Sequence, residues 1–84
     1  MRVRVRLFAA ARAVVGQGEV SVEVEDGSTV GDFMDHFFAR YPELAEMAGS
    51  LLFAVNREFA DQSVGLKDGD EVGVMPPISG GRGA

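Results

Sequence analysis

Residues 2–7 read RVRVRL, and this stretch decides how the rest of the chain can be arranged. Apolar and charged side chains alternate strictly along it. Val3, Val5 and Leu7 fall on one face and the arginines on the other, which is the two-residue period of a half-buried strand.

Residues 20–25, VSVEVE, repeat the alternation with acidic side chains in place of the arginines. The two segments predict an antiparallel pair with Arg2 opposite Glu25. Arg4 would then face Glu23, and each such cross-strand pair contributes about 0.2–1 kcal/mol. We therefore interpret the arginines as a charge-paired solvent face, with an anion site as the alternative.

A helix is predicted to follow Thr29, which with Asp32 three positions later forms a capping-box pattern. Pro42 sets its end at Tyr41, because the residue before proline is disfavoured in the α region. The apolar residues recur at helical spacing, and we interpret them as core rather than as a ligand pocket. They are Val30, Phe33, Met34, Phe37, Phe38 and Tyr41.

Weaker patterns complete the fold. Residues 9–16 and 42–49 predict short helical turns, the first ending at Gly16. Residues 51–56 predict a buried strand with a turn at Asn56 and Arg57, and residues 71–75 predict a last strand after a turn at 67–70.

This order predicts an α+β fold with one main helix packed across a mixed sheet. The helical crossover allows the first and last strands to be parallel neighbours at the sheet centre, as in a β-grasp, or ubiquitin-like, fold. We expect residues 1–75 to form this domain and residues 76–84 to form a flexible tail.

Composition narrows the function classes. The 84 residues carry a net charge of −5, which argues against nucleic acid as a partner. The chain has no cysteine and one histidine, His36, expected on the solvent side, so no metal site is expected. Without a signal peptide or an apolar run of about 18 residues, the sequence predicts a cytoplasmic protein with no membrane contact.

The chain ends in PPISGGRGA, residues 76–84. Pro76 and Pro77 lack amide hydrogens, so they cannot continue a strand and favour an extended exit. Residues 76–81 could extend at most about 20 Å. Glycines at the tip lack side chains and could enter a narrow channel. Composition alone leaves this interpretation and a functionless end equally open.

The segments RLFAAAR, STVGDF, FAVNREF and LKDGDEVGVMPPISGG together cover nearly the whole chain. In this combination they resemble the family of β-grasp sulfur carriers that includes the small subunit of molybdopterin synthase. The chain also resembles the thiazole-pathway carriers, which have a similar fold. This resemblance comes second, because those carriers usually lack a PPxSGG-like ending.

The resemblance implies that Gly81, preceded by Gly80, Ser79, Pro77 and Pro76, carries the chemistry at its carboxylate. A ubiquitin-activating-like adenylyltransferase would use ATP to adenylate Gly81, which then becomes a thiocarboxylate. The large synthase subunit would use this sulfur to build the molybdopterin dithiolene, while the chain binds no cofactor and supplies no acid-base catalysis.

The resemblance also implies a docking patch for both partners at Phe8, Phe59 and Met75. Core packing is the competing interpretation for Phe8 and Met75.

The chain departs from the family in Arg82, Gly83 and Ala84, which follow Gly81. With them in place the Gly81 carbonyl is an amide and cannot be adenylated as a carboxylate. We expect a peptidase to trim the chain after Gly81, although the extension could instead be artificial. The remaining alternatives are a carrier for another pathway (thiamin, cysteine or a specialised metabolite) and a ubiquitin-like interaction module without carrier chemistry.

Overall fold

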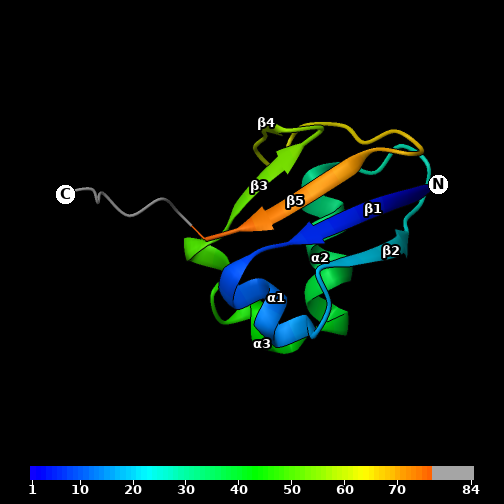
Figure 1. Cartoon of the computed structure of the whole chain (residues 1–84). Helices are drawn as coiled ribbons and strands as arrows, with labels where there is room; N and C mark the ends of the chain where they lie inside the picture. The colour runs from blue at the N-terminus through cyan, green and yellow to red at the C-terminus, as the bar shows by residue number, and fades with distance from the viewer. Residues whose placement is uncertain (77–84) are drawn as a thin grey trace.

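The computed structural model describes residues 1–76, whose elements follow the predicted order with one short strand added at residues 58–59 (Figure 1). No helix in this part of the chain is long and apolar enough to cross a membrane. In chain order the elements are β1 (Arg2–Leu7), α1 (Ala9–Val15), β2 (Glu19–Glu23), α2 (Val30–Arg40), α3 (Pro42–Ala45), the 3₁₀ helix η1 (Ala48–Ser50), β3 (Leu52–Val55), β4 (Glu58–Phe59) and β5 (Glu71–Met75).

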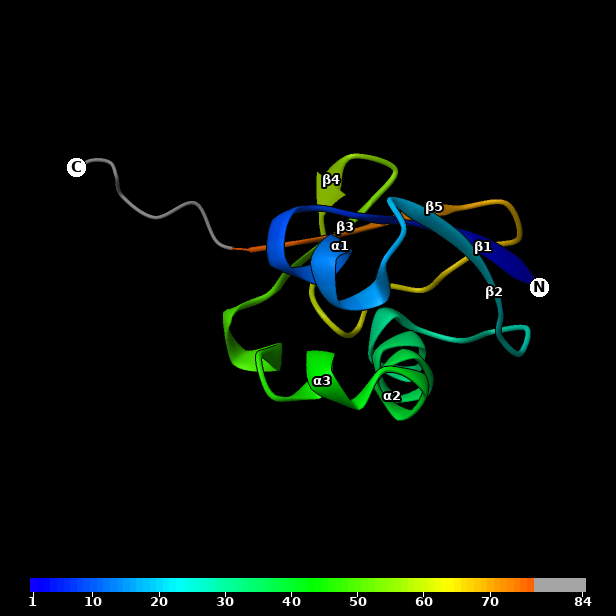
Figure 2. The same ribbon diagram turned by 60° about the horizontal axis from the view of Figure 1, so that its bottom comes forward.

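The strands form one mixed sheet in the order β2-β1-β5-β3-β4. β1 pairs in parallel with β5 and antiparallel with β2, while β5 pairs antiparallel with β3. The parallel central pair of first and last strands is therefore confirmed, and so is the α+β β-grasp fold. The helices lie on one face of the sheet, which leaves the other face open (Figure 2).

Burial follows the predicted alternation. Val3, Val5 and Leu7 of β1 lie in the core, as do Val72 and Val74 of β5. The main helix adds large side chains to this core from its apolar stripe. Val30, Phe33 and Phe37 are fully buried, and Met34, Phe38 and Tyr41 pack against them half-buried.

The main helix, α2, has the predicted start. The Thr29 hydroxyl accepts a hydrogen bond from the Asp32 amide at 3.2 Å, and the Asp32 carboxylate accepts one from the Thr29 amide at 3.0 Å. This capping box satisfies two amides that the first helical turn leaves without partners. The helix ends at Arg40, with Tyr41 as its C-cap and Pro42 opening α3.

The predicted register between the first two strands is wrong by two residues. Arg2 lies opposite Glu23, with 2.9 Å between its guanidinium and the carboxylate, and Arg4 lies opposite Ser21. Glu25 lies in the following turn, where its carbonyl accepts hydrogen bonds from Ser28. The turn at residues 26–27 therefore removes Glu25 from the strand, and β2 begins one residue earlier than predicted.

The segment after β3 contains a strand that the sequence pattern did not reveal. Asn56 and Arg57 form a two-residue turn with φ of 51° and 73°, and the chain returns as the two-residue β4. Positive φ at both central residues is the turn geometry that matches the twist of paired strands. The predicted turns at Gly16 and Gly69 are confirmed, and both glycines have positive φ.

Candidate functional site

Four of the predicted tail residues, Pro77, Ser79, Gly80 and Gly81, lie outside the described residues. Pro76 is the last described residue and directly follows β5, which ends at Met75 as predicted. Because β5 runs parallel to β1, the chain leaves the sheet at the end where β1 passes into α1 (Figure 1). That end carries Phe8, the residue between β1 and α1.

Phe8 and Met75 line one hollow of about 250 Å³ on the open face. Phe8 is 41% exposed, so it is not a core residue, whereas Met75 is half-buried. The other residues around the hollow are Arg6, Ala54, Arg57, Glu71 and Gly73.

Gly73 forms the floor of this hollow. A Cβ atom added there would lie 3.0 Å from the methyl carbon of Met75, 3.8 Å from the Phe8 ring and 3.9 Å from the Ala54 Cβ. Because Gly73, in the middle of β5, has no side chain, the space between Phe8 and Met75 stays open. Glycine in a strand often marks such a close approach, which is the signal that sequence reasoning overlooked here.

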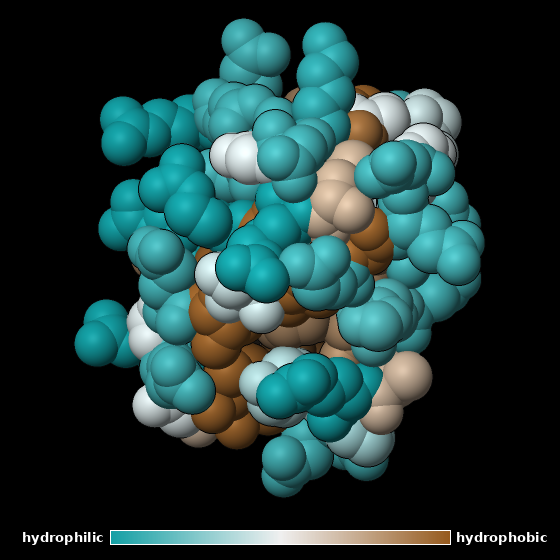
Figure 3. All heavy atoms as spheres, turned by 90° about the vertical axis from the view of Figure 1, so that its right-hand side faces the viewer, coloured by the Kyte–Doolittle hydropathy of each residue, from teal (hydrophilic) through white to brown (hydrophobic). Residues whose placement is uncertain are grey.

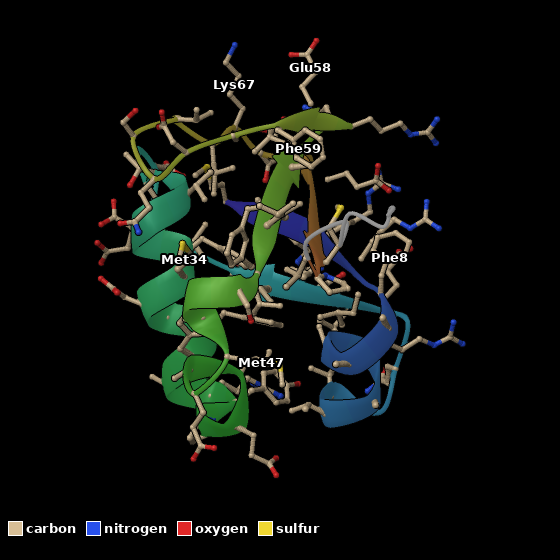
Figure 4. The ribbon with its side chains drawn as sticks, turned by 90° about the vertical axis from the view of Figure 1, so that its left-hand side faces the viewer. Phe8, Met34, Met47, Glu58, Phe59 and Lys67 are labelled. Carbon is tan, nitrogen blue, oxygen red and sulfur yellow. The ribbon has the colours of Figure 1, made fainter. Side chains whose placement is uncertain are left out.

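Phe59, the third predicted docking residue, does not line the hollow. It lies on β4, with β3 and β5 between it and Phe8 (Figure 4). Its pairing with Ala54, which itself pairs with Gly73, places it in the same cross-strand row. At 68% exposed, Phe59 also borders a separate hollow of about 530 Å³ that Met34 lines from α2.

Three charged side chains surround the apolar floor. The Glu71 carboxylate, only 16% exposed, lies 3.5 Å from Arg6 Nη1 and 3.9 Å from Arg57 Nε. The Arg6 guanidinium also lies 5.7 Å from the centre of the Phe8 ring, within the range of a cation–π contact. The hollow thus combines an apolar floor with a basic rim that contains one partly buried acid.

Other titratable groups do not line the hollow. Among residues 1–76, no group of three histidine, cysteine or acidic side chains is arranged to hold a metal ion. The side-chain and backbone hydrogen bonds from Ser63 hold the pKa of the exposed Asp61 below its ordinary value. His36 is exposed as predicted and borders an acidic hollow that includes Glu23 and Asp32.

That acidic hollow lies around the turn between β2 and α2, on the side of the molecule where the chain begins. Figure 3 shows hydrophilic side chains covering most of this side. Glu25 and Asp26 also belong to it. Four of the 13 acidic residues of the chain therefore lie around this turn, away from the end where β5 leads into the tail.

These features define a small ubiquitin-like domain, with a helix-free sheet face and an apolar hollow where its last central strand ends. Comparison with known proteins gives the family: the chain belongs to the ThiS family, which matches residues 5–81.

Three individual proteins illustrate the similarity. The chain is 37% identical over 83 residues to a molybdopterin synthase sulfur carrier subunit from Chlamydomonas reinhardtii, covering 96% of this chain and 100% of the relative. It resembles the crystal structure of SAMP1 from Haloferax volcanii with a TM-score of 0.85 and 28% identity, covering 95% and 99% of the two chains. A chain from the Amycolatopsis orientalis BexX/CysO complex matches with a TM-score of 0.69 and 26% identity, covering 93% and 98%.

Proposed function

We propose that this protein is the sulfur carrier subunit of a molybdopterin synthase and that its Gly81 carboxylate carries the sulfur. The observation that carries the proposal is the family match through residue 81, joined to the position of the hollow. The match ends at the second glycine of the pair and leaves Arg82, Gly83 and Ala84 beyond it. The relative from Chlamydomonas reinhardtii bears the name of this subunit.

The geometry supports two separate roles, in which the domain binds the partner and the tail carries the sulfur. The hollow with Phe8 and Met75 lies where the chain passes from β5 to Pro76. A partner that covers this hollow therefore binds next to the start of the tail, and apolar contact on a rigid sheet positions the tail at that partner's active site.

The chemistry needs two partners that act in turn on the same carboxylate. An adenylyltransferase joins the Gly81 carboxylate to the α-phosphorus of ATP and releases pyrophosphate. A hydrosulfide ion then attacks the acyl carbon, the bond from that carbon to the AMP oxygen breaks, AMP leaves, and the thiocarboxylate remains. The large synthase subunit next takes this sulfur for the dithiolene, so the active site lies on that subunit and this chain supplies the sulfur.

Removal of Arg82–Ala84 must come first, because an amide at Gly81 has no free carboxylate to attack ATP. We propose a peptidase that cleaves after Gly81. The flanking residues suit such cleavage, since Gly80 and Gly81 carry no side chains to exclude the peptide from a narrow protease cleft.

Intact-mass measurement tests the proposal. The chain ending at Gly81 and the chain ending at Ala84 are each incubated with ATP, the adenylyltransferase and a sulfur source. We expect only the shorter chain to gain the mass of one oxygen replaced by sulfur, and only that product to support dithiolene formation with the large subunit. Sulfur transfer from the chain that retains Ala84 would refute the trimming step, and failure of both chains to gain sulfur would refute carrier chemistry.

A further inference from the structure

The rim of the hollow holds more basic than acidic charge. Glu71 is shared by Arg6 and Arg57, so one carboxylate faces two guanidinium groups. The Arg57 side chain is 83% exposed and lies at the longer distance, 3.9 Å. An exposed pair of this length contributes little free energy, so Arg57 can exchange Glu71 for another carboxylate at small cost.

Arg57 also occupies an unfavourable backbone conformation. Its φ of 73° lies in the left-handed region, where a residue with a Cβ is less stable than glycine. Nevertheless an arginine occupies the second position of this turn, where glycine is the usual choice. Backbone strain of this kind is concentrated at functional sites, where the surrounding structure holds the strained residue in place.

The turn is also fixed relative to Glu71. The Asn56 side chain donates a hydrogen bond to the Asp70 carboxylate at 3.0 Å and accepts one from the Glu71 amide at 3.1 Å. The Asn56 amide donates to the Glu71 carbonyl at 2.8 Å. The turn that carries Arg57 is therefore held against the start of β5, so the two residues keep their relative position before any partner binds.

We propose that the partner covering the hollow presents an apolar side chain to the floor at Gly73 and a carboxylate to Arg57. This inference rests on the proposed function, in which that partner is the large synthase subunit. Arg57 is then a specificity-determining residue, because it is a local basic feature on a chain whose net charge is −5. An acidic residue on the partner surface is attracted to Arg57 and repelled by the acidic turn at residues 23–28. These two interactions together fix the orientation in which the partner binds.

The test measures binding of the large synthase subunit to Arg57→Glu, Arg57→Gly and Arg40→Glu. Arg40 lies in the last turn of α2 and provides the same charge change away from the open face. We expect Arg57→Gly to weaken binding by about ten-fold and Arg57→Glu to weaken it further, with little effect of Arg40→Glu. The affinity of the wild-type chain should fall more steeply with salt than that of Arg57→Gly.

Arg57→Gly separates a binding role from a structural one. Because glycine relieves the positive φ, we expect this variant to unfold at a higher temperature than the wild type while it binds more weakly. If Arg57→Gly unfolds at a lower temperature than the wild type, Arg57 stabilises the fold, and the inference that it is present for binding at a cost in stability is wrong. Binding of Arg57→Glu as tight as that of Arg40→Glu would overturn the inference alone. Absence of wild-type binding would overturn the proposed function and this inference with it.

Discussion

The amide of Phe8 donates a hydrogen bond to the carbonyl oxygen of Val74, 3.1 Å away. This bond continues the parallel ladder of β1 and β5 by one residue beyond the pair Leu7 and Val74. It holds Phe8 beside the last residues of β5, although 66 positions of sequence separate Phe8 from Val74. The predicted contact residues Phe8 and Met75 meet because two parallel strands end at the same edge of the sheet.

The capping box at α2 gives the first prediction, which concerns stability. Thr29→Ala removes the hydroxyl that accepts a hydrogen bond from the Asp32 amide. We expect this substitution to lower the free energy of unfolding by about 1 kcal/mol. Thr29→Ser keeps the hydroxyl and should lose much less. Urea unfolding of both variants checks this, and equal losses for Ala and Ser would show that the hydroxyl does not stabilise the helix.

Two phenylalanines of opposite burial give the second prediction. Phe37 is fully buried and stacks on Phe33 with 5.2 Å between ring centres, so Phe37→Ala should cost about 3–5 kcal/mol, a large part of the stability of a domain this small. Phe59→Ala, at a residue that is 68% exposed, should change the free energy of unfolding by less than about 1 kcal/mol. Thermal unfolding compares the two. A large loss for Phe59→Ala would show that β4 depends on that ring.

Much of the fold was predictable because it depends on local patterns. The alternation at residues 2–7 and the capping box at Thr29 each have one reasonable structural interpretation, and both are confirmed. The register of β1 and β2 was not predictable, since charge pairing favours Arg2 with either Glu23 or Glu25. The choice between them depends on the turn after β2, which is stabilised by Ser28 and by the hydrogen bond from the Val24 amide to the Met1 carbonyl.

The site was predictable only in part, for a different physical reason. Phe8 and Met75 were chosen from a family resemblance, and the structure brings these two together while Phe59 lies farther along the sheet. Gly73 and Arg57, which also line the hollow, were overlooked, because each is brought there by its neighbours on other strands. Gly73 lies between two valines in the sequence, and Arg57 lies in a turn. That both line the same hollow becomes evident only when the strand order is known.

Asp61 gives a prediction about pH. Hydrogen bonds from Ser63, the side-chain bond above all, hold the pKa of Asp61 below its ordinary value of 3.8. The stabilisation is therefore present above the unfolded-state pKa and is lost as pH falls through the lower, folded-state pKa. In Ser63→Ala the titration midpoint of Asp61, followed by NMR, should rise toward the ordinary value. A midpoint unchanged by the substitution would assign the shift to another group.

Gly73 gives the last prediction, which separates docking from folding. In Gly73→Ala the new methyl group fills part of the hollow, and only the mobile end of Met75 has to move to admit it. Glycine weakens a strand interior, so the free energy of unfolding should stay within about 1 kcal/mol of the wild-type value. Affinity for the large synthase subunit should nevertheless fall, because the partner's apolar side chain loses its space over the floor.

Gly49→Ala is the matched control, because a Cβ atom at Gly49 meets no atom within 4 Å and this residue lies in η1 rather than in the sheet. Calorimetric titration of the large subunit with both variants compares their affinities, and thermal unfolding compares their stabilities. If Gly73→Ala binds as tightly as Gly49→Ala, the floor of the hollow is not covered by the partner. If it binds more weakly and remains folded, Gly73 is kept as glycine for the space it leaves between Phe8 and Met75 rather than for its backbone conformation.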